Sequence, residues 1–146
     1  MKTAIVYSSV HHENTKKIVE AMAKENDIDL IDATKKQEVN LEKYDLIGFA
    51  SGIYYSKFHR TLLQFAQVNL PENKDVFFVY TSGSDKKDYS TSIKSIALEK
   101  NANIKGTFFC RGYDTYGPLK IVGGINKNRP DENDLKNAAD FIKGLL

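Results

Sequence analysis

Hydroxyl and amide side chains gather in one short segment near the start of the chain. Residues 7–16 include two serines, an asparagine and a threonine: Ser8, Ser9, Asn14 and Thr15. They precede a predicted helix, where several backbone N–H groups lack an intrahelical partner and the helix dipole is positive. A phosphate group fits such a site. Ser9 and Asn14 would equally serve as plain helix caps, so both interpretations stay open.

The histidines and the cysteine are the other residues that could do chemistry. His11 and His12 are adjacent, and adjacent residues rarely chelate one ion, so with only Glu13 nearby we expect no metal site. When protonated, either histidine would add positive charge beside a phosphate. We expect His59, at the start of a predicted helix, to be structural. Cys110 ends a predicted buried strand, so we expect an unreactive core thiol.

A second segment, residues 51–59, combines small residues with three aromatic ones. Tyr54 and Tyr55 follow directly after a predicted buried strand and could flank a flat aromatic ligand. Phe58 continues the apolar stripe of the next predicted helix, so we expect it in the core. At least one of the two tyrosines is therefore a candidate for stacking on a ligand.

Two later segments are also rich in small, polar and aromatic residues. Residues 81–89 could offer backbone groups to the edge of a heteroaromatic ring, although an ordinary turn has the same composition. Residues 112–118 mix glycine with tyrosine, and long loops in compact domains tend to be functional. The chain has neither a P-loop nor a G-x-G-x-x-G sequence, so nucleoside triphosphate and Rossmann dinucleotide chemistry are not indicated.

Alternating strands and helices explain how these four segments meet. Apolar runs without apolar/polar alternation predict buried parallel strands, and amphipathic stretches predict helices between them. We expect strands at 3–7, 28–31, 46–50, 76–80 and 104–110, and helices at about 14–24, 62–68, 90–100 and 130–146. The last helix would have Pro130 in its first turn. Right-handed crossovers then place the four segments along one edge of a doubly wound α/β sandwich.

Length, charge and cysteine content narrow the class of protein. The 146 residues contain no linker or repeat, so we expect a single domain over 1–146. A formal net charge of +2 is too small to indicate nucleic acid binding. One cysteine excludes a disulfide-stapled secreted scaffold. The four-residue apolar run near the N-terminus, residues 4–7, is too short for a signal peptide or a membrane span, so we expect a cytoplasmic protein.

At this point the pattern resembles the flavodoxin family over essentially the whole chain. Residues 7–15, 52–55 and 81–89 carry the resemblance, each in register with the end of a strand. The fifth strand lacks the insertion of long-chain flavodoxins, so the short type is implied. The resemblance implies a flavodoxin-like three-layer sandwich, with a five-stranded parallel sheet of order 2-1-3-4-5 and non-covalent FMN at the carboxyl edge of the strands.

The resemblance also implies which residues would contact FMN. The phosphate would be held by loop amides and by Ser9, His12, Asn14 and Thr15, and Ser8 would also be among the cofactor-binding residues. The isoalloxazine would lie between two loops, with Gly52, Ile53, Tyr54 and Tyr55 on one and Ser82, Gly83 and Tyr89 on the other. The protein would contribute no catalytic residue of its own. It would instead set the redox potentials of the flavin through its surroundings.

Three functions are compatible with this reasoning. We favour an electron-transfer protein that docks transiently on redox partner proteins, as a monomer or weak homodimer, because the chain is too short for a second substrate domain. The alternative is an FMN-dependent oxidoreductase acting on a quinone or porphyrinogen-type substrate. Residues 50–59 also resemble the same region of flavodoxin-fold protoporphyrinogen oxidases, and the pI of about 8.5 departs from an acidic carrier. A phosphoacceptor receiver domain would need acidic residues where Ser8, Ser9 and Ser51 stand.

Overall fold

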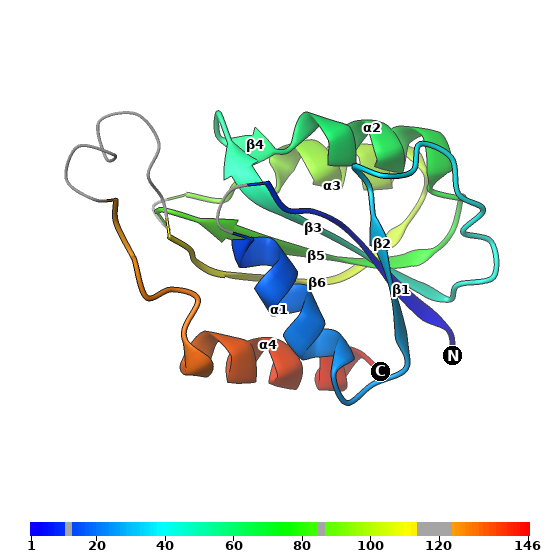
Figure 1. The fold of residues 1–146 in the computed structure, drawn as a ribbon. Helices are drawn as coiled ribbons and strands as arrows, with labels where there is room; N and C mark the ends of the chain where they lie inside the picture. Colours follow the sequence, from blue (N-terminus) through cyan, green and yellow to red (C-terminus); the bar gives the residue numbers. More distant parts are fainter. Residues whose placement is uncertain (11–12, 85–86, 114–123) are drawn as a thin grey trace.

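A parallel sheet forms the centre of the molecule, and two helices cover each of its faces (Figure 1). This computed structural model describes residues 1–10, 13–84, 87–113 and 124–146. The parallel strands are β1 (Thr3–Ser8), β2 (Ile28–Asp32), β3 (Leu46–Tyr54), β5 (Asp75–Ser82) and β6 (Asn103–Arg111). Their order across the sheet is β2-β1-β3-β5-β6. Counted as the five parallel strands, this is the predicted order 2-1-3-4-5, so the predicted fold class is confirmed.

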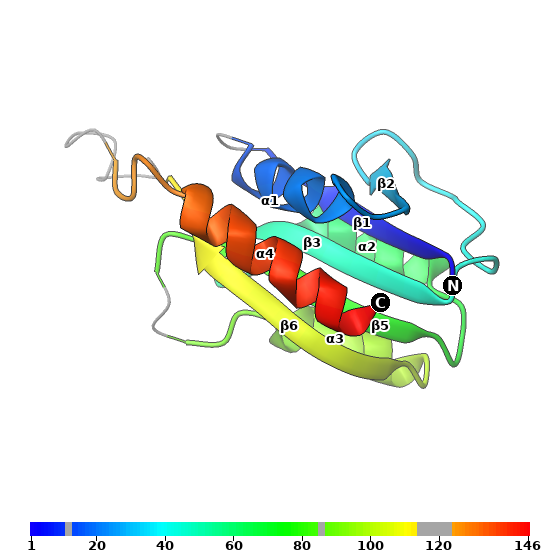
Figure 2. The ribbon, with the colours of Figure 1, turned by 90° about the horizontal axis from the view of Figure 1, so that it is seen from below.

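The helices pack in two pairs on opposite faces. They are α1 (Asn14–Ala23), α2 (Arg60–Asn69), α3 (Thr91–Glu99) and α4 (Glu132–Leu145). Figure 2 shows α1 and α4 together in front of the sheet, while α2 and α3 lie behind it. Because successive strand residues point to opposite faces, β5 fills both cores. Its Phe78 belongs to the core under α2 and α3, and its Phe77 to the core under α1 and α4.

One glycine allows β3 and β5 to pack around an aromatic ring. Gly48 of β3 lies opposite Phe77 of β5 in the register of the sheet. A Cβ atom at position 48 would lie 2.3 Å from Cζ of Phe77, closer than two carbon atoms can approach. The ring of Phe77 therefore occupies the space that any side chain at position 48 would need.

Two predicted boundaries were wrong. The polar and aromatic segment after residue 50 was expected to be a loop, but β3 continues to Tyr54 and pairs in an antiparallel hairpin with β4 (Lys57–Phe58). Phe58 is buried as predicted, but on this strand and not on the helix. The last helix begins at Glu132, so Pro130 lies before its first turn, and Asp131 is the N-cap with a reciprocal capping box to Asp134.

The strand β6 forms one edge of the sheet and carries an irregularity. Val76 of β5 pairs with Ile104, whereas the next residue, Phe77, pairs with Gly106, so Lys105 is the extra residue of a bulge. Among the helices that the structure describes, none is long and apolar enough to cross a membrane.

Candidate functional site

The carboxyl ends of the parallel strands bring three of the predicted segments together. Ser8 at the end of β1 lies beside Ser51 of β3, Gly52 of β3 lies beside Thr81 of β5, and Ser82 lies beside Arg111 of β6. The polar residues that follow β1, β3 and β5 therefore share one edge, as the topology predicted.

The N-terminus of α1 is the polar centre of this edge. The N-cap residue Glu13 adopts a left-handed conformation, with φ of 52°, and its side chain makes no capping hydrogen bond. Ser9 Oγ instead accepts from the backbone N–H of Lys16 at 3.1 Å. Ser9 thus acts as a helix cap, and its hydroxyl hydrogen is left for another acceptor.

Asn14 at this helix start and Ser8 at the end of β1 each have a buried polar atom. The Asn14 side chain donates through Nδ2 to the carbonyl oxygen of Tyr113 at 2.9 Å, which fixes the orientation of the amide. Within the described ranges, Asn14 Oδ1 and Ser8 Oγ are buried without any hydrogen-bond partner. Because a buried polar group without a partner costs free energy, these two atoms mark a place where a ligand can supply the missing partners.

The side chains of α1 are also tied to β5 and β6. Thr15 Oγ1 lies 2.9 Å from Thr81 Oγ1 in a buried hydrogen bond. Gly112, just after β6, lies so close to Asn14 that a Cβ atom there would be 2.5 Å from Asn14 Nδ2. Neither Thr81 nor Gly112 was predicted as a site residue, because both contacts join residues far apart in the sequence. His12, the remaining predicted phosphate residue, lies outside the described residues, as does the segment 114–123.

The hairpin between β3 and β4 presents its aromatic residues in different ways. Tyr55 and Ser56 form a two-residue turn in which both have positive φ, 52° and 66°, and Tyr55 is 85% exposed. The Tyr54 ring packs over Gly52 and meets the imidazole of His59 edge-on, with ring centroids 4.9 Å apart. Ile53 is partly buried against the core under α2 and α3.

A buried serine holds this hairpin to the start of α2. Ser51 Oγ accepts from the backbone N–H of His59 at 2.9 Å and donates to the carbonyl oxygen of Gly52 at 2.6 Å. His59 in turn caps α2, because its Nδ1 accepts from the backbone N–H of Thr61 at 3.1 Å. The structural role that we predicted for His59 is confirmed, and the hairpin is held at both of its ends.

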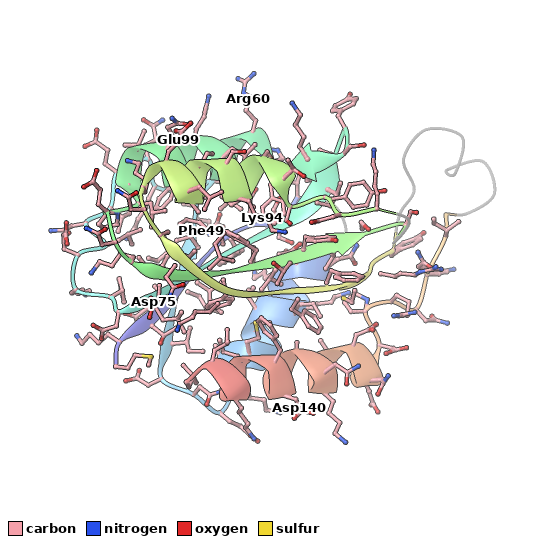
Figure 3. The ribbon with its side chains drawn as sticks, turned by 180° about the vertical axis from the view of Figure 1, so that it is seen from behind. Phe49, Arg60, Asp75, Lys94, Glu99 and Asp140 are labelled. Atoms are coloured by element: carbon pink, nitrogen blue, oxygen red, sulfur yellow. The ribbon has the colours of Figure 1, made fainter. Side chains whose placement is uncertain are left out.

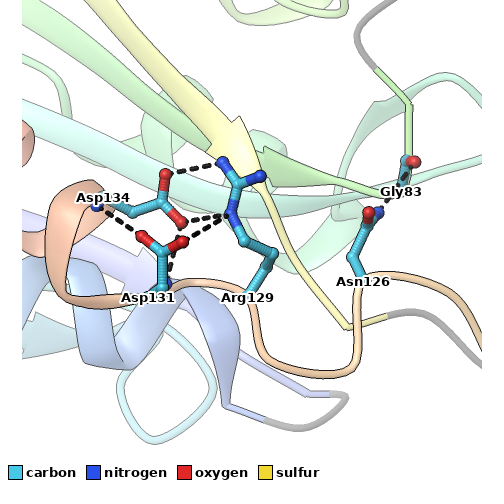
Figure 4. Close-up of polar contacts among 5 residues, drawn as sticks. All are labelled: Gly83, Asn126, Arg129, Asp131 and Asp134. Carbon is cyan, nitrogen blue, oxygen red and sulfur yellow. Dashed lines mark hydrogen bonds and ion pairs between the residues drawn. The ribbon is translucent and has the colours of Figure 1, made fainter.

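The loop after β5 is held by its own bonds and by a distant residue. Ser82 Oγ donates to the carbonyl oxygen of Ser84, and the carbonyl oxygen of Gly83 accepts from Asn126 Nδ2 at 3.1 Å (Figure 4). The ring of Tyr89 is partly buried, edge-on to Tyr80 at 6.0 Å. The Lys87 ammonium lies 5.5 Å from the centre of the Tyr89 ring, so Lys87 must move before a ligand can stack on that face.

An ion pair anchors the segment that leads to α4. The Arg129 guanidinium donates to both carboxylate oxygens of Asp134, at 2.5 and 2.7 Å (Figure 4). Burial alone would raise the pKa of the Asp134 carboxyl, but the bonds from Arg129 and Asp131 outweigh it and lower that pKa. The Arg129 carbonyl oxygen accepts from the backbone N–H of Tyr113, so this anchor also positions the residue that binds Asn14.

Two further titratable groups lie near the edge. Burial raises the pKa of the Cys110 thiol to about 12, which agrees with the predicted unreactive core thiol. Burial, followed by the charge of Asp32, raises the pKa of the Tyr7 hydroxyl. Neither group is set to exchange a proton near neutral pH. The arrangement is therefore suited to binding a ligand with hydroxyl, anionic and planar parts, through hydrogen bonds and stacking.

Comparisons with known proteins agree with the fold. The family model described as a flavodoxin domain matches residues 4–120. An uncharacterized protein of Methanocaldococcus jannaschii is 40% identical over 148 residues, covering 100% of this chain and 99% of that protein. A flavodoxin of Streptococcus pneumoniae has a similar structure, with a TM-score of 0.71 at 16% identity over 99% of this chain and 97% of that one. The structure of oxidised flavodoxin 2 of Bacillus cereus is similar too, with a TM-score of 0.68 at 17% identity over 98% of this chain and 96% of that one.

Proposed function

The chain belongs to the flavodoxin family, and from that premise we propose that it is an electron-transfer protein that binds FMN non-covalently at the carboxyl edge of its sheet. The family and the fold are those of flavoproteins. We further propose that the chain acts as a single cytoplasmic domain that makes transient contacts with redox partner proteins. FMN supplies the redox chemistry when bound, and the residues of the chain bind it, orient it and limit its contact with water.

One observation carries the proposal: two buried polar atoms without partners, Ser8 Oγ at the end of β1 and Asn14 Oδ1 at the start of α1. A phosphate dianion offers only acceptors, so it can bond Ser8 Oγ–H and the N–H groups of the helix start, but not Asn14 Oδ1. A ribityl hydroxyl is a donor and fits Asn14 Oδ1. We therefore assign Ser8, Ser9 and Thr15, with His12, to the phosphate, and the Asn14 side chain to the ribityl chain.

The two remaining loops would hold the isoalloxazine. Gly52, Ile53, Tyr54 and Tyr55 would lie on one side of the ring, and Ser82, Gly83 and Tyr89 on the other. Ser51 and Asn126 support this assignment, since each fixes one of the two loops by hydrogen bonds. A pair of loops held in place before the ligand arrives loses little conformational entropy on binding.

A second function, FMN-dependent oxidation or reduction of a quinone or porphyrinogen-type substrate, is favoured by one observation. Tyr55 is 85% exposed at the tip of the hairpin, where a planar substrate could stack on it. Steady-state turnover with a quinone and NAD(P)H would support this enzyme. Photoreduction that proceeds in two separate one-electron steps, without such turnover, would support the carrier.

Titration of the protein with FMN tests the proposal. We expect one FMN per chain and strong quenching of flavin fluorescence, and the absence of quenching at micromolar protein would refute both redox functions. Replacing Thr15 by alanine should weaken FMN more than riboflavin, because only FMN carries the phosphate. Replacing Asn14 by alanine should weaken both ligands, because both carry the ribityl chain. Asn133→Ala, an exposed change on α4, is the control.

A further inference from the structure

A groove of about 690 Å³ lies beside α2, outside the proposed flavin site. One wall is the segment 33–37, which follows β2, and the other is the outer surface of α2 from Arg60 to Val68. The volume lies in the range of known ligand sites. Because Ala33 follows the carboxyl end of β2 and Arg60 follows the hairpin, the groove begins at the same edge of the sheet as the proposed flavin site and runs away from it.

Hydrogen bonds fix the loop wall at the near end and tie the two walls together at the far end. At the near end, Asp32 Oδ1 accepts from the backbone N–H and the hydroxyl of Thr34, at 2.9 and 2.6 Å. At the far end, Asn69 Nδ2 donates to the carbonyl oxygen of Gln37 at 2.9 Å, and Asn69 Oδ1 accepts from the backbone N–H of Val39 at 3.0 Å. Specific contacts between the segment and the helix therefore fix the far end of the groove.

The charges that line the groove have one sign. Lys36 lies on the loop wall and Arg60 on the helix wall, where its side chain extends outward from α2 (Figure 3). Neither has an ion-pair partner in the part of the chain that the structure describes, and no carboxylate is among the described residues of the lining. Two carboxylates flank the lining in the sequence, those of Asp32, whose Oδ1 accepts from Thr34, and of the exposed Glu38, but the charged residues of the lining itself are both positive. The groove therefore attracts a negatively charged ligand.

The rest of the lining suits an extended peptide. Gln37, Gln64 and Gln67 have side-chain amides that can bond to a peptide backbone, and Leu63 and Val68 offer apolar surface, with Val68 63% exposed. The nine residues from Arg60 to Val68 span about 12 Å of helix, which is the length of about four residues of extended chain. A small anion would occupy only the charged residues and would leave the amides and the apolar side chains uncovered.

We propose that this groove binds an extended acidic segment of a partner protein. Carboxylates of the segment pair with Lys36 and Arg60, and its apolar side chains cover Leu63 and Val68. A partner held here lies next to the hairpin of Tyr54 and Tyr55. That this partner is a redox partner rests on the proposed function, whereas the binding of an acidic segment does not.

The test uses the full chain and a fluorescein-labelled peptide, Glu-Leu-Glu-Glu-Leu-Glu, followed by fluorescence anisotropy. We expect saturable binding that weakens with added salt, and none for the same peptide with glutamine in place of glutamate. Lys36→Glu combined with Arg60→Glu should weaken binding by about tenfold or more, since two attractive ion pairs become repulsive. Lys105→Glu combined with Lys136→Glu makes the same change in net charge away from the groove and should change binding by less than about twofold.

Four outcomes would overturn the inference. They are no binding of the glutamate peptide, equal losses in the two double variants, displacement of the peptide by equimolar inorganic phosphate, and no effect of Val68→Asp. Equal losses in the two double variants would show non-specific attraction between charges. Displacement by phosphate would show a site for a small anion. Circular dichroism of each variant identifies any that fails to fold, and Gln64→Ala then serves as a milder substitution within the groove. Each binding measurement is made with and without FMN. A failure of flavin binding is then seen separately from a failure of peptide binding.

Discussion

The side chain of Asn14 at the start of α1 donates a hydrogen bond to the carbonyl oxygen of Tyr113, 99 residues further along the chain. The bond joins the first helix to the segment that follows the last strand. Gly112 makes the approach possible, because a side chain at that position would occupy the place of the Asn14 amide. The geometry of the proposed ribityl contact therefore depends on Gly112, a residue that need not touch the flavin at all.

Replacing Gly112 by alanine should push the Asn14 amide aside. We expect a loss of about 1–3 kcal/mol in the free energy of unfolding, as for other overpacked sites. FMN binding should weaken as well, because Asn14 Oδ1 moves. Urea unfolding and FMN titration measure the two effects. In Gly144→Ala the new Cβ meets nothing within 4 Å, so this helical site should gain about 0.5–1 kcal/mol. Equal behaviour of the two variants would contradict the close packing at residue 112.

The hairpin turn should be stabilised by residues that prefer positive φ. Tyr55 and Ser56 both have left-handed backbone conformations, which favour asparagine and glycine. Tyr55→Asn combined with Ser56→Gly should raise the free energy of unfolding by about 1–2 kcal/mol. If Tyr55 stacks on the flavin, the same variant should bind FMN more weakly, whereas Tyr55→Phe should bind it normally. A variant that is more stable and binds FMN as well as the parent would remove Tyr55 from the site.

Acid should weaken the anchor between Arg129 and Asp134. The folded-state pKa of the Asp134 carboxyl is lowered, so its contribution is present above the unfolded pKa, near 4, and is lost as the pH falls through the folded value. Asp134→Asn should cost about 1.5–3 kcal/mol at pH 7 and should lose less additional stability between pH 5 and 3 than the parent. Unfolding curves across that range measure the difference. Asp140→Asn is an exposed change on the outer side of α4 (Figure 3), and its free energy of unfolding should depend on pH as that of the parent does.

The Cys110 thiol should be inert in the folded protein. It is 8% exposed and its pKa is raised to about 12, so very little thiolate forms at pH 8. We expect no reaction with a thiol-specific reagent under native conditions and one thiol per chain after unfolding in guanidinium chloride. Rapid labelling of the native protein would show that the end of β6 opens readily. A Cys110→Ala variant, which has no thiol, gives the background signal of the reagent.

The sequence was most informative where burial alone determines structure. The apolar run at residues 76–80 predicts a strand buried on both faces, and its side chains do alternate between the two cores. Amphipathic periodicity likewise predicted all four helices to within a few residues. The order of the strands came from the resemblance to a family, because hydrophobic pattern does not state which strand lies beside which.

The parts that were missed have no signal in the local composition of the chain. The turn at Tyr55 and Ser56 contains neither glycine nor asparagine, so nothing in its composition indicated a hairpin. The pairing of Thr15 with Thr81, and of Asn126 with Gly83, appears only once the strands are placed side by side. The candidate site could therefore be predicted as a set of loops, but not as a network of bonds.

The bulge in β6 has a consequence for how these molecules behave together. An edge strand offers a row of N–H and C=O groups to which a strand from another molecule can pair, which is a common route to aggregation. In β6 the extra residue interrupts that row and is a lysine, and the strand ends on the exposed charge of Arg111. We expect this edge to resist intermolecular sheet formation, so that the protein stays dispersed at high concentration.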